Sequence, residues 1–418
     1  MKKNFDVIVI GGGPSGMMSA GRAGELGAQV LLIEKNDHLG KKLSLTGGRR
    51  CNITNAETDN RVFLENFPES KQFLFSPFSQ FNVKDTFEFF ETLNLPLVIE
   101  DRKRAFPKSQ KADDVRDALE KYMKQTGNVE ILLETVFKSF KIKENRIVGI
   151  TTSSGTFLAN KIVVATGGLA VPATGSTGDG LSALNKIGHT IKAPNPNLAP
   201  LCTNSKWIHD LSGTSVDDIG LRFIQKNKTQ FKVRGRILFT HFGISGPMVI
   251  NSAHKVKCLL KKGEVEASID LFPDCDLGSL DAFFIKLFDE QKNKKLKSIL
   301  NTLLQKSLVE AMLNMLESDM NDMQAHSITK QQRKSLVQIV KDLRFPIQGT
   351  MGLEWSIVAD GGVDPKEIDF KTMASRLHPN IYLTGDIIDI NRPSGGFSLQ
   401  LCWTTGFVAG THSAKKQS

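Results

Sequence analysis

The sequence predicts an α/β fold in which both ends of the chain build one domain, with a β-rich part and a helical part inserted between them. Three observations predict it. The chain opens with an apolar strand, a glycine turn and a helix. Strand-and-glycine segments return at residues 161–168 and again from about residue 347 to the end. Between them, residues 279–343 have the apolar spacing of amphipathic helices.

The first predicted elements lie within residues 5–35. "FDVIVIG" is a nearly continuous apolar run, as expected of a buried parallel strand. Residues 14–26 have helical spacing, and "AQVLLIEKN" is typical of a second buried strand. A helix is predicted over residues 112–126, because Asp113 and Asp114 stand near its positive end. "VEILLETVFKSFKI", "RIVGITTSSGTF" and "NKIVVATGG" then predict a meander of strands.

The inserted part begins at a change of composition. "PNPNLAP", residues 194–200, is typical of a linker, and apolar and polar residues alternate from there to about residue 273. We therefore predict a nucleotide-binding domain at residues 1–193 and 347–418, a β-rich domain at 194–276 and a helical subdomain at 277–346.

The glycine turn after the first strand predicts a dinucleotide site. Gly11, Gly13 and Gly16 form GxGxxG between strand and helix: the first permits the turn, the second lets a pyrophosphate approach, and the third lets helix pack on strand. The helix N-terminus attracts phosphate. Glu34, 23 positions after Gly11, ends the next strand and can accept hydrogen bonds from ribose hydroxyls. The alternative is an ordinary turn with a solvated Glu34.

Later segments favour FAD over NAD as the dinucleotide. A flavin needs backbone contacts beyond one fingerprint, and "VVATGG" at residues 163–168 and "IYLTGD" at 381–386 end in small residues suited to a flat cofactor. Asp386 is placed to bond a polyol or pyrophosphate. A helix beginning near Gly395 and Gly396 would stabilise negative charge on reduced flavin. Residues 178–183, "GDGLSA", lack a preceding strand and are assigned to the loop beside FAD, so no second nucleotide domain is predicted.

Composition limits the compartment and the partners. The 418 residues include 54 Lys and Arg against 44 Asp and Glu, a net charge of +10. No apolar run reaches the roughly 20 residues of a membrane span, and no secretion signal is recognisable. Five scattered cysteines argue against disulfides and metal sites and favour the cytoplasm. The basic residues occur along the whole chain without a nucleic-acid-binding motif, so a small-molecule substrate is favoured over nucleic acid; no oligomeric state is predicted.

Four segments carry a family resemblance over nearly the whole chain: "GKKLSLTGGRRCNITN" (40–55), "RAFPKSQKADDVRDAL" (104–119), "ILFTHFGISGP" (237–247) and "GDIIDINRPSGGFSLQ" (385–400). The chain resembles the bacterial FAD-binding flavoproteins known as aminoacetone-oxidase-like or bile-acid-enone-reductase-like NAD(P)/FAD-dependent oxidoreductases. Arg49 stands where that family usually has a glycine, and Asp386 where it often has glutamate. The resemblance implies a two-part Rossmann-like FAD-binding domain with an inserted β-rich and helical domain.

Motif positions and resemblance together imply the cofactor site. The predicted residues are Gly11, Gly13, Pro14, Ser15, Gly16, Glu34, Lys35, Lys42, Arg50, Cys51, Asn52, Val136, Ala165, Thr166, Gly167, Gly385, Asp386, Gly395, Gly396, Phe397 and Gln400. Val136 is expected on the first strand of the meander, where its backbone would contact adenine.

The predicted chemistry is electron transfer through flavin N5. Cys51 stands alone where disulfide reductases have a cysteine pair, which disfavours a dithiol relay. His241 is a candidate acid or base, and Arg104 with Phe106 a candidate carboxylate clamp, although a turn histidine and a packed ion pair are equally ordinary. The expected enzyme is a FAD-dependent oxidoreductase of an amine or conjugated enone, with NAD(P)H, oxygen or another protein as the second redox partner. The alternatives are a flavin-containing RNA-modifying or RNA-binding protein and a non-catalytic flavoprotein.

Overall fold

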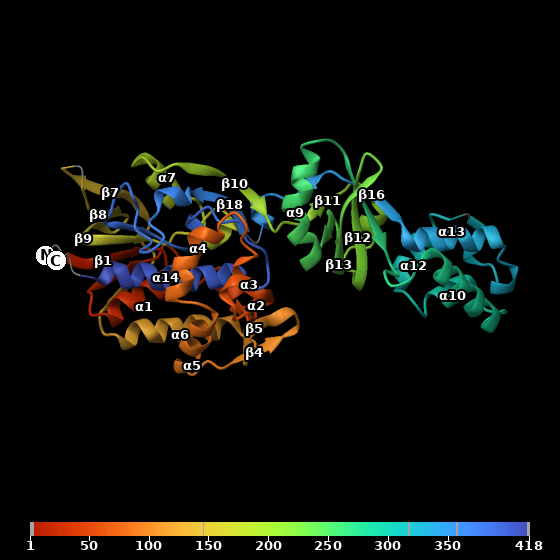
Figure 1. The fold of residues 1–418 in the computed structure, drawn as a ribbon, viewed down its shortest axis with the longest axis horizontal. Coiled ribbons are helices and arrows are strands. Elements are labelled where there is room, and N and C mark those ends of the chain that lie inside the picture. Colours follow the sequence, from red (N-terminus) through yellow and green to blue (C-terminus); the bar gives the residue numbers. More distant parts are fainter. Residues whose placement is uncertain (1–3, 145, 317, 357, 416–418) are drawn as a thin grey trace. The chain divides into compact units, whose positions relative to one another are not determined.

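The structure is a computed structural model that describes residues 4–144, 146–316, 318–356 and 358–415. The chain divides into two compact units (Figure 1). The first unit is Met1–Pro196 with Leu353–Ser418, and the second is Asn197–Gly352. Each unit has its own hydrophobic core. These divisions fall at residues 196/197 and 352/353, a few positions after the 193/194 and 346/347 expected from composition.

The first unit is built on a seven-stranded sheet in the order β6-β2-β1-β9-β8-β7, with β19 also paired to β9. Its strands are β1 (Asn4–Ile10), β2 (Val30–Ile33), β6 (Val129–Leu132), β7 (Phe137–Lys143), β8 (Arg146–Thr152), β9 (Gly155–Val164) and β19 (Ile381–Leu383). The strands β6, β2, β1, β9 and β19 are parallel, and β7 and β8 are antiparallel. The β2 residues are all buried, as a central parallel strand requires.

Helices α1 (Pro14–Glu25) and α14 (Phe397–Ala414) run side by side along one face of this sheet (Figure 1). Two glycines of α14 permit this close packing. A Cβ at Gly406 would lie 2.6 Å from the carbonyl oxygen of Ser15, and a Cβ at Gly410 would lie 2.6 Å from that of Ser19. The Ser19 hydroxyl also donates to the carbonyl of Gly406 at 2.9 Å. Helix α14 therefore packs closely against α1, the helix that follows the glycine turn.

The remaining elements of the first unit surround this core. They are α2 (Thr46–Arg49), β3 (Thr54–Asn55), α3 (Asn60–Leu64), α4 (Lys71–Gln80), α5 (Val83–Thr92), β4 (Leu97–Glu100), β5 (Arg104–Pro107), α6 (Ala112–Gln125), α7 (Asp179–Lys186), β10 (Ile191–Asn197) and β18 (Val358–Val363). The strands β3, β5 and β4 form a small antiparallel sheet, and β10 pairs with β18. An Asn82–Asp85 capping box begins α5.

The second unit is built on an antiparallel seven-stranded sheet in the order β16-β15-β12-β13-β14-β11-β17. Its elements are β11 (Leu201–Cys202), α8 (Lys206–Asp210), β12 (Ser215–Gln225), β13 (Lys228–Thr240), β14 (Gly243–Ser245), α9 (Pro247–Leu260), β15 (Val265–Asp270), α10 (Leu277–Glu290), α11 (Leu296–Leu300), α12 (Lys306–Leu313), α13 (Lys330–Lys341), β16 (Leu343–Ile347) and β17 (Gly349–Thr350). Residues 343–346, expected in the helical part, instead lie in β16 and pair with β15. Within the described ranges, no helix is both long and apolar enough to cross a membrane.

Candidate dinucleotide-binding site

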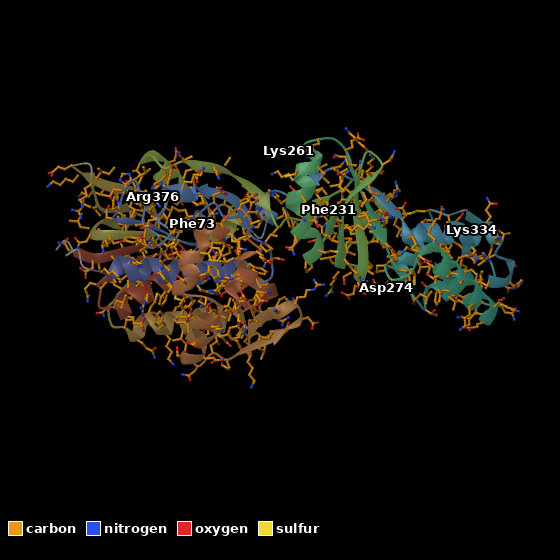
Figure 2. The ribbon with its side chains drawn as sticks, viewed as in Figure 1. Phe73, Phe231, Lys261, Asp274, Lys334 and Arg376 are labelled. Carbon is orange, nitrogen blue, oxygen red and sulfur yellow. The ribbon has the colours of Figure 1, made fainter. Side chains whose placement is uncertain are left out.

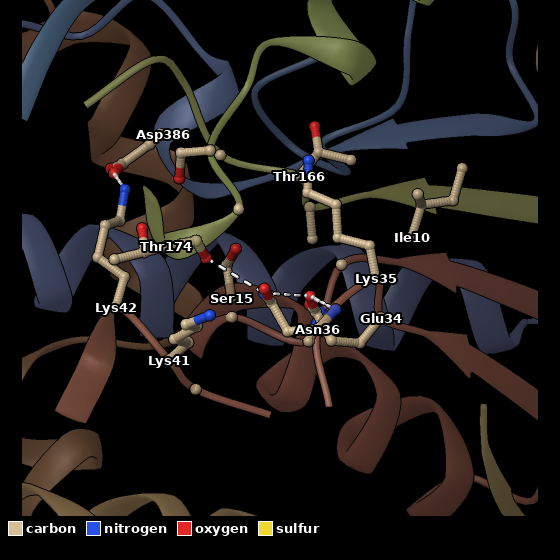
Figure 3. A pocket seen from close by; sticks show the side chains of 18 of the residues that line it. Ile10, Ser15, Glu34, Lys35, Asn36, Lys41, Lys42, Thr166, Thr174 and Asp386 are labelled. Atoms are coloured by element: carbon tan, nitrogen blue, oxygen red, sulfur yellow. Dashed lines mark hydrogen bonds and ion pairs between the residues drawn. The ribbon is translucent and has the colours of Figure 1, made fainter. Parts of the chain in front are cut away.

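A pocket lies in the first unit where the parallel strands β1, β2, β9 and β19 end (Figure 3). Gly11 has φ of +104°, and a Cβ there would lie 2.6 Å from the carbonyl oxygen of Ala165, so only glycine fits. A Cβ at Gly16 would lie 1.9 Å from the carbonyl oxygen of Gly11. At Gly13, the N-cap of α1, a Cβ would meet no protein atom within 4 Å. The backbone at the helix tip is thus open toward the pocket.

Glu34 directly follows β2 and lines this pocket with only 9% of its surface exposed. Its Oε2 accepts a 2.7 Å hydrogen bond from the N–H of Gly12. Its Oε1 accepts from the backbone and side-chain nitrogens of Asn36 at 2.9 and 2.7 Å. A carboxylate has about four lone-pair positions and three are used here, so Glu34 Oε2 retains one acceptor position for a ribose hydroxyl.

Another wall of the pocket comes from the loop before α7 and the first residue of that helix: Gly175, Ser176, Gly178 and Asp179 line it. "GDGLSA" lies beside the pocket as expected, but residues 179–183 form the start of α7 and not a loop. The Lys35 ammonium donates to Asp179 at 2.8 Å and so fastens the loop to the end of β2.

A charge cluster, Lys42–Asp386–Arg392, occupies the other end of the site from Glu34; Arg392 is buried, and Lys42 and Asp386 are partly buried. Figure 3 shows Lys42 and Asp386 together, apart from Glu34 and Asn36. Lys42 Nζ lies 3.3 Å from Asp386 Oδ2, and Arg392 Nη2 lies 3.0 Å from Asp386 Oδ1. Burial raises the pKa of Asp386, but attraction to Arg392 and Lys42 outweighs it and leaves the carboxyl pKa below its ordinary value. The cluster therefore carries one net positive charge beside the pocket.

The predicted cofactor residues divide into two groups. Those that line the pocket are Gly11, Gly13, Pro14, Ser15, Glu34, Lys35, Lys42, Ala165, Thr166, Gly167 and Asp386. Those outside its lining are Gly16, Arg50, Cys51, Asn52, Val136, Gly385, Gly395, Gly396, Phe397 and Gln400. Within the second group, Gly16 and Gly385 pack against residues that line the pocket. A Cβ at Gly16 would lie 1.9 Å from the carbonyl oxygen of Gly11, and a Cβ at Gly385 would lie 2.5 Å from Oγ of Ser15.

Arg50 and Arg104 meet on one aromatic ring instead of entering this pocket. Their guanidinium carbons lie 4.1 and 5.6 Å from the ring centroid of Phe106. Arg50 also bonds Gln110 at 2.6 Å and pairs with Glu100, which lies 3.8 Å from Arg104. The suggested carboxylate clamp at Arg104 is thus engaged by a carboxylate of the protein itself.

The loop before β3 reaches the start of α14. Asn52, with its amide turned to satisfy its neighbours, accepts from the N–H of Gly396 at 3.0 Å. A Cβ at Gly396 would lie 2.3 Å from the carbonyl carbon of Thr54, so glycine permits the contact. Gln400 is fully buried, and its amide is satisfied by Thr54, Thr86 and Thr404. These residues position the helix tip.

Val136 and Cys51 differ from expectation. Val136 lies between β6 and β7, not on the first strand of the meander, and its N–H and C=O both bond Ser153 at 2.9 Å. Its neighbours Thr135 and Phe137 line the pocket instead. Cys51 is fully buried, and burial raises the pKa of its thiol to about 12. A thiolate at Cys51 is therefore strongly disfavoured at neutral pH.

His241 lies in the second unit, on the turn between β13 and β14. Its side chain is exposed, and its ring centroid lies 4.9 Å from that of Phe242. Among the described residues, the lining of the pocket in the first unit does not include it.

Several pocket residues were not among the predicted site residues. They are Ile10, Gly12, Ile33, Asn36, Gly40, Lys41, Thr135, Phe137, Thr174 and Cys402. Asn36 could have been found from its position two residues after the ribose-binding glutamate. Arg392 lies in the segment 385–400 that carries the family resemblance, but it was not among the predicted site residues, because its role depends on contact with Asp386.

Fold and site together define a Rossmann-type dinucleotide-binding protein whose nucleotide domain is formed by both chain ends. The chain belongs to the HI0933-like family: the HI0933-like protein Rossmann domain matches residues 5–412. This FAD-dependent Rossmann family confirms the resemblance, and it implies FAD as the cofactor.

Two relatives match nearly the whole chain. The 3-dehydro-bile acid delta(4,6)-reductase of Clostridium scindens is 28% identical over 411 residues, covering 98% of each chain. The ribosomal RNA dihydrouridine synthase of Escherichia coli K12 is 28% identical over 414 residues, covering 97% of each.

Solved structures share the fold. The flavocytochrome c3 fumarate reductase has a TM-score of 0.51 at 16% identity, covering 99% of this chain and 78% of that one. The 3-ketosteroid delta1-dehydrogenase of Sterolibacterium denitrificans has a TM-score of 0.55 at 13% identity, covering 98% and 99%. The predicted class, a Rossmann FAD-binding fold with an inserted antiparallel-sheet domain, is confirmed.

The residues present fit the adenosine diphosphate part of FAD. The hydroxyl of Thr166 lines the pocket, is buried and has no hydrogen-bond partner in the protein. The open backbone at Gly13 and the net positive Lys42–Asp386–Arg392 cluster suit a diphosphate. Glu34 suits the adenosine ribose.

Proposed function

We propose that this protein is a FAD-dependent reductase that adds hydrogen across a carbon–carbon double bond conjugated to a carbonyl. The observation that carries the proposal is the shared chemistry in the names of the two full-length relatives. A delta(4,6) double-bond system in a 3-dehydro bile acid is conjugated to the 3-ketone. Dihydrouridine differs from uridine by hydrogen across C5=C6, which is conjugated to the C4 carbonyl. In the proposed reaction, a hydride is delivered to the electron-poor end of such a bond.

Bound FAD would supply two-electron hydride transfer to this chemistry. The protein's part in the first unit is to hold the cofactor: Glu34 toward the ribose, the α1 tip and Lys42 toward the diphosphate, and Asp386 toward the polyol. The helix α14 would direct its positive end toward developing negative charge. Cys51 and Cys402 are buried, and burial raises the pKa of each thiol to about 12, so neither favours a thiol relay.

NAD(P)H is the proposed electron donor. NAD(P)H gives up one hydride and becomes NAD(P)⁺. That hydride equivalent is added to the β-carbon of the conjugated bond, and a proton from solvent is added to the α-carbon. The product therefore gains two hydrogens, and the two electrons of NAD(P)H balance the reduction. An amine substrate, the other class expected from the sequence, would require oxidation in the opposite direction.

A uracil base within RNA is a second candidate substrate. The net charge of +10 favours it, because a basic surface attracts a polyphosphate chain. Both candidates share the same reacting bond, so they differ in what the protein surface binds and not in the chemistry.

The visible spectrum of the holoenzyme under anaerobic conditions tests the proposal. We expect NADH or NADPH to bleach the flavin, and a conjugated enone or a uridine-containing RNA to restore its colour. Product analysis should show a saturated α,β bond. Bleaching by amines with no response to NADH or NADPH would refute the reductase assignment, and a flavin that no small acceptor reoxidises would indicate a non-catalytic flavoprotein.

A further inference from the structure

Residues 219–263 of the second unit carry an excess of positive charge equal to the net charge of the whole chain. The whole chain has 54 Lys and Arg against 44 Asp and Glu. Residues 219–263 contain ten of these Lys and Arg and no Asp or Glu, so the rest of the chain holds 44 residues of each sign. Other short stretches are also basic, but acidic residues elsewhere in the rest of the chain balance them.

The arginines of this segment are neutralised by carboxylates from outside it. The pairs are Arg222 with Asp342 at 2.9 Å, Arg234 with Asp218 and Asp274 at 2.7 and 2.6 Å, and Arg236 with Asp217 at 3.5 Å. Six lysines remain exposed, and among the described residues no carboxylate pairs with them: Lys226, Lys228, Lys232, Lys255, Lys261 and Lys262. We call these six the lysine cluster.

The fold brings the lysine cluster to one end of the sheet. Lys226 and Asn227 form the two-residue turn between β12 and β13, with φ of 51° and 59°, as a type I′ hairpin requires. The next residue back, Gln225, is buried, and its amide donates to the carbonyls of Leu259 and Gly263 at 2.9 and 3.0 Å. Those carbonyls flank Lys261 and Lys262. One buried amide therefore fastens the hairpin turn to the end of α9.

A second contact joins the hairpin to α9 further along. The Lys255 ammonium lies 5.6 Å from the ring centroid of Phe231 on β13, and Figure 2 labels Phe231 and Lys261 in this unit. Adjacent strand residues point to opposite faces, so Lys232 lies on the face of the sheet away from Phe231 and α9. The lysine cluster thus continues from the α9 side, around the hairpin end, to the opposite face.

We propose that the lysine cluster binds the phosphate backbone of RNA. The ammonium groups lie on both faces of the sheet and on the hairpin end that joins them. This arrangement suits a flexible chain of phosphates, because such a chain can bend around the end of the sheet. They do not suit a flat anionic membrane, and the exposed large apolar residues of the segment are limited to Leu238 at 37% exposure among the described residues. The proposal deepens the proposed function, on which its catalytic meaning rests, by assigning the RNA substrate class.

Fluorescence anisotropy with a labelled, uridine-containing single-stranded RNA tests the surface. The variant Lys226→Gln/Lys261→Gln/Lys262→Gln removes three charges, and Lys84→Gln/Lys121→Gln/Lys138→Gln removes three exposed charges from the first unit as a matched control. Each phosphate contact on single strands contributes about 0.7 to the slope of log K against log salt. We expect the cluster variant to lower the slope by about 2 and to weaken binding at least about tenfold at low salt, while the control resembles the parent protein.

Equal weakening by both variants, or none by the cluster variant, would overturn the proposal. Binding of phosphatidylserine vesicles but not of RNA would overturn it in favour of a membrane surface. NADH-dependent reduction of a free enone is measured on the same proteins and should be unchanged in the cluster variant. If the parent protein reduces the enone but does not bind the RNA, only the surface is contradicted, whereas RNA binding by the parent protein without any reduction would contradict only the reductase.

Discussion

The backbone N–H of Gly12 donates a 2.7 Å hydrogen bond to Oε2 of Glu34, so the first turn of the chain and the end of the second strand share one carboxylate. This carboxylate braces the glycine turn and also faces the pocket. Its loss should therefore affect cofactor retention in two ways, through the ribose contact and through the shape of the turn.

Replacing Glu34 should release FAD. In Glu34→Gln one charged acceptor becomes a neutral amide, and in Glu34→Ala both acceptors disappear. Because hydrogen bonds to charged groups contribute about 1.5–3 kcal/mol each, we expect FAD affinity to fall about tenfold or more for Gln and further for Ala. Flavin fluorescence after dialysis measures the loss. Glu91→Gln, on the exposed face of α5, is the control and should retain FAD. If Glu34→Gln and Glu34→Ala retain as much FAD as Glu91→Gln, Glu34 does not bind the ribose.

Removing Arg392 should make stability depend on pH through Asp386. With Arg392 present, the pKa of Asp386 lies below its ordinary value, so its contribution to stability is complete above about pH 4 and is lost as the pH falls further. In Arg392→Leu, burial should raise this pKa above its ordinary value, and the ionised carboxylate should become costly near pH 7. We expect a loss of about 3–5 kcal/mol at pH 7 that shrinks toward pH 4.

Urea unfolding at the two pH values measures this difference. The variant Arg392→Leu/Asp386→Asn serves as the control, because it also removes the carboxylate that Arg392→Leu leaves with Lys42 as its only cationic partner. This double variant should recover part of the stability at pH 7. A loss of the same size at both pH values would show that Arg392 acts by packing and not by charge.

Adding a methyl group to α14 at its contact with α1 should destabilise the first unit. In Gly406→Ala the new Cβ would meet the carbonyl oxygen of Ser15 at 2.6 Å, and such overpacking costs about 1–3 kcal/mol. We expect lower thermal stability together with weaker FAD retention, since Ser15 lines the pocket. Gly278→Ala in α10 is the matched control, because its Cβ would be 3.5 Å from the nearest atom outside its own chain neighbours. Similar melting temperatures for both variants would contradict tight packing at Gly406.

Local patterns in the sequence predicted the strand, turn and helix around Gly11, and the position of Glu34 in the pocket. Both follow from neighbours within about thirty residues, where apolar spacing and glycine geometry are informative. The first unit also keeps the predicted helix at residues 112–126, observed as Ala112–Gln125, because that segment is strongly amphipathic.

Side chains whose environment depends on distant segments were harder to place. Arg50 matches a cofactor motif, yet it lies over Phe106, a ring that the linear sequence does not associate with it. Gln400 is satisfied by Thr54 and Thr86, more than 300 positions earlier. Residues 343–347 form a strand because β15 offers them a partner, and apolar spacing alone cannot distinguish that strand from a continued helix.

The contact of Gly406 and Gly410 with Ser15 and Ser19 has a consequence for synthesis. The glycine turn leaves the ribosome nearly 400 residues before the helix that packs against α1. Until residues 397–414 have emerged, α1 lacks the helix that packs against it. Cofactor capture should therefore wait until α14 has emerged from the ribosome, and a nascent chain stalled before α14 should carry no flavin colour.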